Sequence, residues 1–90
     1  MKQEELYKKA IQKWGLNSQL GMFYEELGEL ITALNKFTRD VNGCSLEKVA
    51  EEIADVEIMI EQFQVMSSLK RKTIDSIKEK KINKLRGMLQ

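Results

Sequence analysis

Residues 51–56 read EEIADV and repeat, position by position, the pattern of residues 25–30, EELGEL. Each stretch has two acidic residues, an aliphatic residue, a small residue, another acidic residue and another aliphatic residue. Residues three apart on an α-helix lie about 60° apart around its axis and about 4.5 Å apart along it. The sequence therefore predicts two helices that each carry two carboxylates on one side. We call Glu26 with Glu29 the first acidic pair and Glu52 with Asp55 the second acidic pair.

Both acidic pairs fall among apolar residues. At about 100° per residue, the wheel neighbours of Glu26 are Gln19, Met22, Phe23, Leu30, Ala33 and Phe37, and those of Glu52 are Val49, Val56, Met59, Ile60, Phe63 and Met66. Burying an ionised carboxylate costs several kcal/mol, and several facing carboxylates repel one another unless cations lie between them. Paired glutamates usually form solvated surface. Here, however, both pairs occupy the same position around their helices and both lie inside an apolar sector. This arrangement favours a site for Mg²⁺ or Mn²⁺.

Length and composition limit the classes of protein and site. Ninety residues fit one domain over residues 1–90, but so short a chain buries only about 60% of its unfolded surface, which favours oligomerisation. Cys44 is the only cysteine and histidine is absent, which excludes the common zinc sites, a Cys-His nucleophile and a Ser-His-Asp triad. No apolar run is long enough to span a membrane and the N-terminus does not resemble a signal peptide, so we expect a soluble cytoplasmic protein without membrane partners.

Charge is distributed unevenly along the chain. Residues 1–69 hold seven Lys and Arg against twelve Asp and Glu, whereas residues 70–90 hold eight against two. A basic C-terminal helix suggests nucleic-acid binding, but this one lacks aromatic residues for stacking, so nucleic acid is an unlikely partner. The commoner explanation for these basic residues is a solvated helix face. A third explanation is that they neutralise metal-bound phosphates.

The absence of proline and the apolar spacing predict an all-α, four-helix, bundle-like fold. The expected helices cover about residues 2–14, ending at Gly15; about 18–38, capped by Asn17 or Ser18; about 46–66, capped by Ser45; and about 72 onward, after a turn at 67–72. A short break at residues 40–43 makes the two central helices antiparallel and brings the acidic pairs face to face. The third helix is apolar over a wide arc, which predicts a homodimer or homotetramer. In the fourth helix, Ile74, Ile77, Ile82, Leu85 and Leu89 are expected core positions.

With the acidic pairs placed, the chain resembles the MazG-like, all-α nucleoside triphosphate pyrophosphohydrolases, particularly the short phage and bacterial members. The family signature, Glu-Glu-x-x-Glu followed by Glu-x-x-Asp, is matched by Glu25, Glu26 and Glu29 and then by Glu52 and Asp55, with twenty-two residues between the halves. The resemblance covers nearly the whole chain. It implies a MazG-type fold and the Mg²⁺-dependent hydrolysis of (d)NTP to (d)NMP and pyrophosphate, for example in house-cleaning of the nucleotide pool.

The resemblance also assigns roles to residues. It implies metal ligation by Glu26, Glu29, Glu52 and Asp55, and a catalytic role for Glu25 and Glu51 in orienting the ligands or positioning the attacking water. Lys81, Lys84 and Arg86 are the candidates for binding the phosphates, although Leu85 stands where the family often has Asn; the alternative for the three cations is a solvated face. Trp14 and Gln19 are candidates for contacting the base, and the alternative for Trp14 is a plain core position.

Two other functions stay open. One is a non-catalytic helical interaction module in which the acidic pairs form salt bridges with the basic C-terminal helix. The other is a small nucleic-acid binder that uses residues 70–90. Within the family, phosphoribosyl-ATP hydrolysis and a dUTPase-like preference are both compatible with the sequence.

Overall fold

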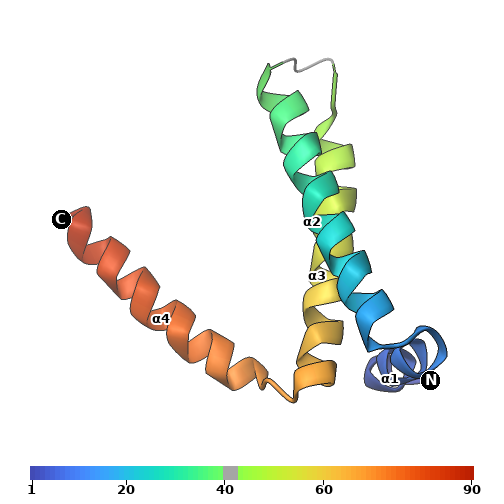
Figure 1. Ribbon diagram of the computed structural model, residues 1–90. Helices are drawn as coiled ribbons and strands as arrows, with labels where there is room; N and C mark the ends of the chain where they lie inside the picture. The colour runs from blue at the N-terminus through green and yellow to red at the C-terminus, as the bar shows by residue number, and fades with distance from the viewer. Residues whose placement is uncertain (40–42) are drawn as a thin grey trace.

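The computed structural model describes residues 1–39 and 43–90 and is all-helical, as expected. Its helices are α1 (Gln3–Trp14), α2 (Leu16–Arg39), α3 (Leu46–Ser67) and α4 (Arg71–Met88), and the described residues contain no strand (Figure 1). The helix ends predicted from the sequence agree within about two residues. Most of the break predicted at residues 40–43 lies outside the described residues. None of the described helices is long and apolar enough to cross a membrane.

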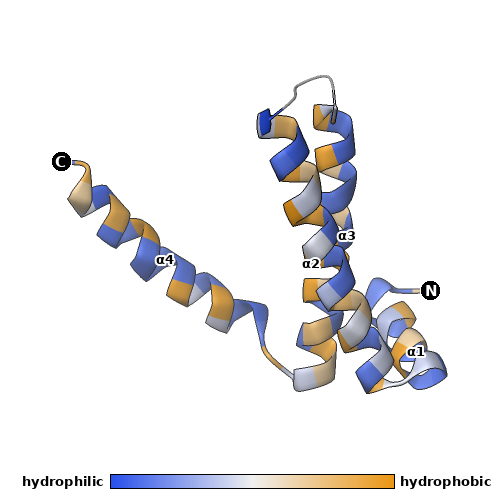
Figure 2. Ribbon diagram, turned by 45° about the horizontal axis from the view of Figure 1, so that its top comes forward, coloured by the Kyte–Doolittle hydropathy of each residue, from blue (hydrophilic) through white to orange (hydrophobic). Residues whose placement is uncertain are grey.

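The antiparallel pair of α2 and α3 forms the centre of the fold, and α1 packs across the end of the pair that holds the start of α2 (Figures 1 and 2). The core between these helices is small. Its buried apolar side chains are Ala33, Cys44, Val49, Val56 and Met59. Phe37 packs against the three of them nearest the α2–α3 connection, and Phe23 meets Phe63 with ring centroids 6.3 Å apart. This packing fixes the register in which the two acidic pairs meet.

The helix ends follow local rules. The Ser45 hydroxyl accepts a hydrogen bond from the Lys48 backbone N–H at 3.1 Å, which confirms the predicted N-cap of α3. Gly15 ends α1 with φ of 92°, a conformation that favours glycine, and its carbonyl accepts the first hydrogen bond of α2 from Gln19 at 3.1 Å. The expectation that Asn17 or Ser18 caps α2 is wrong. Because one glycine joins the two helices directly, both residues lie within the first turn of α2.

Helix α4 diverges from the other three helices instead of packing on them (Figure 1). The chain leaves α3 through Ser68, whose φ of 60° lies in the left-handed region and turns the backbone sharply. Most of the apolar side chains of α4 therefore remain exposed within one chain, with Ile77 49% and Leu85 53% exposed, whereas Ile74 is partly covered. The expectation that the apolar residues of α4 join the core is wrong for a single copy of the chain.

Candidate metal centre

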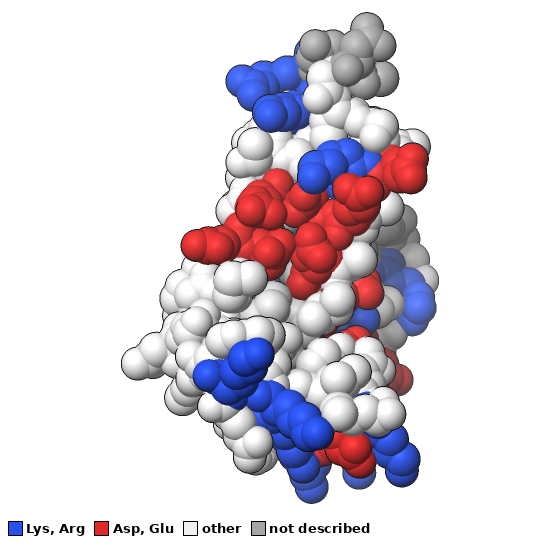
Figure 3. Space-filling view, turned by 90° about the vertical axis from the view of Figure 1, so that its right-hand side faces the viewer, with Lys and Arg blue, Asp and Glu red and all other residues white. Residues whose placement is uncertain are grey.

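The two acidic pairs meet near the middle of α2 and α3. One carboxylate oxygen from each of Glu26, Glu52 and Asp55 lies within 4.8 Å of the others. We call these three residues the acidic cluster. On the surface, Asp and Glu side chains gather in a band across this face of the helix pair (Figure 3). The antiparallel register that the sequence predicted thus brings residues from both halves of the repeat to one place.

The three side chains of the acidic cluster differ in how deeply they are buried. Glu52 is only 4% exposed, Glu26 is half-buried and Asp55 is exposed. One oxygen of Glu26 and one of Glu52, the Oε2 atom in each case, are buried without a hydrogen-bond partner among the described residues. A buried acceptor without a partner costs about 1–3 kcal/mol, and more when it is charged. Two such atoms in one cluster therefore indicate a place for a cation.

The carboxylates around the acidic cluster affect the protonation of Glu26. Burial raises the pKa of Glu26 above its ordinary value, and the negative charges of Glu29, Asp55 and Glu52 raise that pKa further. A divalent cation would remove the repulsion and supply the missing partner for the buried oxygens. The donor set consists of carboxylate oxygens alone, which suits a hard ion such as Mg²⁺ or Mn²⁺ better than a soft one.

Glu29 lies beside the acidic cluster rather than within it. Its side chain is exposed, and none of its oxygens falls within the 4.8 Å set, although its charge contributes to the raised pKa of Glu26. The structure therefore brings together three of the four expected ligands.

The two residues expected to orient ligands or water, Glu25 and Glu51, both lie on the solvent side. Glu25 is exposed and lines a groove next to the acidic cluster. Glu51 is exposed and lies 3.8 Å from the Lys48 ammonium. Neither side chain faces the interior of the helix pair.

The groove beside the acidic cluster has a volume of about 680 Å³ and runs between α2 and the start of α3. Glu29 and Glu52 line it together with Lys36, Lys48 and the buried Cys44. Lys36 is seven residues beyond Glu29, which corresponds to about 10 Å along α2. A single groove thus holds carboxylates that could bind a cation and ammonium groups that could bind an anion.

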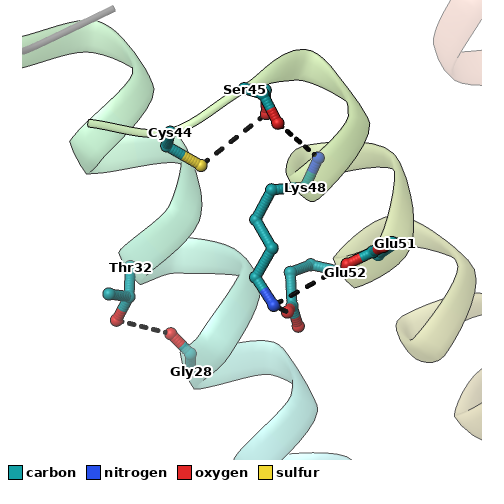
Figure 4. Close-up of polar contacts among 7 residues, drawn as sticks. All are labelled: Gly28, Thr32, Cys44, Ser45, Lys48, Glu51 and Glu52. Carbon is teal, nitrogen blue, oxygen red and sulfur yellow. Dashed lines mark hydrogen bonds and ion pairs between the residues drawn. The ribbon is translucent and has the colours of Figure 1, made fainter. Parts of the chain in front are cut away.

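Lys48 is the residue of this site that the sequence reasoning missed. Its ammonium lies 2.9 Å from Oε1 of Glu52, and its side chain extends over Glu51 and Glu52 (Figure 4). The pKa of Lys48 is raised, first by its hydrogen bond to Glu52 and then by the charge of that carboxylate. The signal was present in the sequence, since Lys48 precedes Glu52 by four residues and so lies on the same side of the helix.

The residues proposed to contact the base lie toward α1. Gln19 is buried, and its amide donates a hydrogen bond of 2.8 Å to the Gln62 side-chain oxygen, which links α2 to α3. Trp14 is 57% exposed at the end of α1, so it is not a core residue, and the Lys13 ammonium lies 5.5 Å from its ring centroid. Gln19 precedes Glu26 by seven residues, about 10 Å along α2.

The residues proposed to bind phosphates lie on α4, away from the acidic cluster. Lys81, Lys84 and Arg86 are exposed, and Arg86 donates a hydrogen bond of 2.6 Å to Asn83 on its own helix. Among the described residues, no ion pair joins α4 to α2 or α3. Within one chain these three cations and the acidic cluster belong to separate surfaces.

Comparison with known proteins gives no relative for this chain: no family model, curated protein or solved structure matches it.

Proposed function

We propose that this protein is a Mg²⁺-dependent nucleoside triphosphate pyrophosphohydrolase of the MazG-like type, which cleaves (d)NTP to (d)NMP and pyrophosphate. One observation carries the proposal: Glu26 and Glu52 each keep a buried carboxylate oxygen without a partner in a cluster with Asp55. The match of the sequence to the family signature supports the same assignment, and we infer a role in house-cleaning of the cytoplasmic nucleotide pool.

The side chains suggest a division of labour. Glu26, Glu52 and Asp55 would hold the divalent cation, and Glu29 would complete the ligand set from the rim. A bound Mg²⁺ neutralises charge on phosphate oxygens and lowers the pKa of a coordinated water. Glu25 and Glu51, on the solvent side, would orient the ligands or the attacking water. Because water is the nucleophile, the chain needs neither a histidine nor a reactive cysteine.

We further infer that the working protein is a dimer or tetramer. Exposed apolar side chains occur on α3, with Ile53 and Ile58 each 42% exposed, and along α4 from Ile77 onward. Burying both faces against a second copy would supply the core that one chain lacks. The charge pattern suggests how: a basic α4 from one copy complements the acidic band of another, which would bring Lys81 and Lys84 to that copy's groove.

The proposal is tested by assaying pyrophosphate release from a panel of standard and damaged (d)NTPs, with Mg²⁺ or Mn²⁺ and with EDTA. We expect monophosphate and pyrophosphate from at least one substrate, only with the metal. Asp55→Asn should be inactive, whereas Glu57→Gln, which removes an exposed carboxylate of α3 outside the acidic cluster, should remain active. Diphosphate and orthophosphate as the only products, or no turnover of any substrate, would remove the assignment.

The same experiments separate the two alternatives. A non-catalytic module would show no turnover, and Mg²⁺ would leave its melting temperature unchanged. A nucleic-acid binder that uses α4 would bind single-stranded or duplex probes with an affinity that falls steeply as salt rises.

A further inference from the structure

Glu52 is the most buried carboxylate of the acidic cluster, and it already has a cation beside it. Its side chain is 5% exposed, and its Oε1 atom lies 2.9 Å from the Lys48 ammonium, while its Oε2 atom has no partner. The Lys48 side chain itself is 55% exposed. An ion pair with one buried and one exposed partner is asymmetric, because the carboxylate depends on the ammonium far more than the ammonium depends on the carboxylate.

Local structure holds Lys48 in this place. The Ser45 cap fixes the first turn of α3, and Lys48 then lies one turn before Glu52 on the same side of the helix. The ammonium also lies 3.8 Å from Glu51, and its side chain lines the groove beside the acidic cluster. Lys48 therefore has an exposed acidic neighbour and open solvent to move into if it leaves Glu52.

We propose that Lys48 is a tethered counter-ion of the metal site: its ammonium neutralises Glu52 in the metal-free protein and leaves Glu52 when a divalent cation binds. The proposal rests on the metal site proposed above. Lys48 stabilises the fold without metal, and by the same contact it weakens the binding of the metal, since the two cations compete for one carboxylate. The displaced ammonium stays in the groove with Lys36, where both can meet an anionic ligand.

The direction of each effect follows from Coulomb's law. A unit positive charge within a few ångströms of a bound divalent cation repels it, with an energy that depends on how well water screens the pair. Because the Lys48 ammonium is half exposed, the screening is strong, and removing that charge should tighten Mg²⁺ binding by about threefold to tenfold.

The test compares wild type with Lys48→Met, which keeps the length of the side chain and removes the charge. In EDTA, Lys48→Met should melt below wild type, because the buried Glu52 loses its counter-ion. By calorimetry with Mg²⁺ alone, it should bind the ion more tightly. Lys48→Arg, which keeps the charge, should follow wild type in both measurements.

Two controls isolate the contact with Glu52. Lys36→Met removes a positive charge from the same groove, and Lys8→Met breaks an exposed i, i+4 ion pair of α1, between Lys8 and Glu4 at 3.5 Å. Each should change Mg²⁺ affinity less than Lys48→Met does. In a Glu52→Gln background, Lys48→Met should cause no further loss of melting temperature.

Different results overturn the two proposals. If wild type binds Mg²⁺ and Lys48→Met binds it with equal or weaker affinity, the counter-ion role is wrong while the metal site stands. The counter-ion role is also wrong if Lys48→Met destabilises the Glu52→Gln protein as much as it does wild type. If calorimetry and melting show no Mg²⁺ binding by wild type, the metal site and the displacement of Lys48 fall together.

Discussion

Glu26 of α2 and Glu52 of α3 meet across the helix pair, and each keeps one buried carboxylate oxygen without a hydrogen-bond partner. The two residues are twenty-six positions apart in the sequence and occupy the same place in the two repeated stretches. Two carboxylates in such surroundings destabilise the fold unless a proton, a metal ion or a counter-ion such as the Lys48 ammonium reduces their charge. The stability of the protein and its affinity for a metal ion therefore depend on the same two carboxylates.

Glu52→Gln should abolish hydrolysis and leave the metal-free protein as stable as wild type or more stable, by up to about 1–3 kcal/mol. The substitution removes like-charge repulsion, and it leaves behind an exposed Lys48 that water can solvate, not a buried one. Melting curves in EDTA and in millimolar Mg²⁺ measure both effects. Wild type should gain in melting temperature with Mg²⁺ and the variant should not.

The matched control for this experiment is Glu57→Gln, which should keep the response to Mg²⁺. A Glu52→Gln protein that melts far below wild type in EDTA would show that Glu52 has a structural role that depends on its charge. That result would count against the interpretation of the acidic cluster as a metal site.

Without metal, the stability of the protein should increase as the pH falls from neutral toward 4.5, the ordinary pKa of a glutamate. The pKa of Glu26 is higher in the folded protein than the ordinary value, which applies to the unfolded chain. At a pH between the unfolded and the folded pKa, the folded protein therefore binds more protons than the unfolded chain. Its free energy of unfolding then falls as pH rises. Melting temperatures across this range in EDTA should show the trend, and Glu26→Gln should reduce it.

Mg²⁺ should change that pH dependence. Because the ion binds the deprotonated carboxylate, its affinity should decrease as the pH falls, and the gain in melting temperature from Mg²⁺ should shrink with it. A gain from Mg²⁺ that is the same at pH 5 and pH 7.5 would exclude Glu26 as a ligand.

The protein should be larger in solution than the 10.5 kDa of one chain. Apolar side chains of α3 and α4 are exposed in one chain, and a second copy could cover them. Light scattering at micromolar concentration measures the mass. Leu85→Glu, on the apolar side of α4, should shift the mass toward that of a monomer, whereas Glu79→Gln, at an exposed charged position, should not; a monomeric wild type would contradict the prediction.

Lys81→Ala with Lys84→Ala should raise KM for the nucleotide, so that this variant is almost inactive at nucleotide concentrations far below its KM, and mixing it with Glu52→Gln should restore activity at those concentrations. If α4 of one copy serves the groove of another, a mixed dimer contains one site with all its residues intact. If the chains of the two variants pair at random, half of the dimers are mixed and each mixed dimer has one intact site of two. The mixture should then recover about a quarter of the wild-type activity. Activity that stays absent after unfolding and refolding the mixture would mean that each α4 serves its own chain or none.

Gln19→Ala should lower the free energy of unfolding by about 1–3 kcal/mol, because it leaves the amide of the buried Gln62 without its partner. Denaturant titration measures this loss. The double variant Gln19→Leu with Gln62→Leu should recover much of it, since both polar groups are then absent. If Gln19 also contacts the base, both variants should raise KM, an effect separate from the change in stability.

The sequence alone predicted the local features of the site well. The approximate ends of the helices, the Ser45 cap and the shared face of the second acidic pair depend on hydrogen bonds and spacings within a few residues, and all three agree with the structure, whereas Glu29 of the first pair lies outside the acidic cluster. Even the misplaced cap of α2 is a local error, because the single residue Gly15 joins two helices where a longer connection was expected.

The sequence determined that the chain is helical and that Glu26 and Glu52 occupy equivalent positions on two antiparallel helices. Only the tertiary structure decided that Glu52, in its ion pair with Lys48, lies at a buried position, which carboxylate oxygens are left without partners, and that α4 diverges from the pair. Helix periodicity gives the direction of a side chain around the helix axis. It does not give how deeply a neighbouring helix buries that side chain. The direction of α4 depends on a few backbone angles around Ser68, and a helix of eighteen residues extends any change in them over about 27 Å.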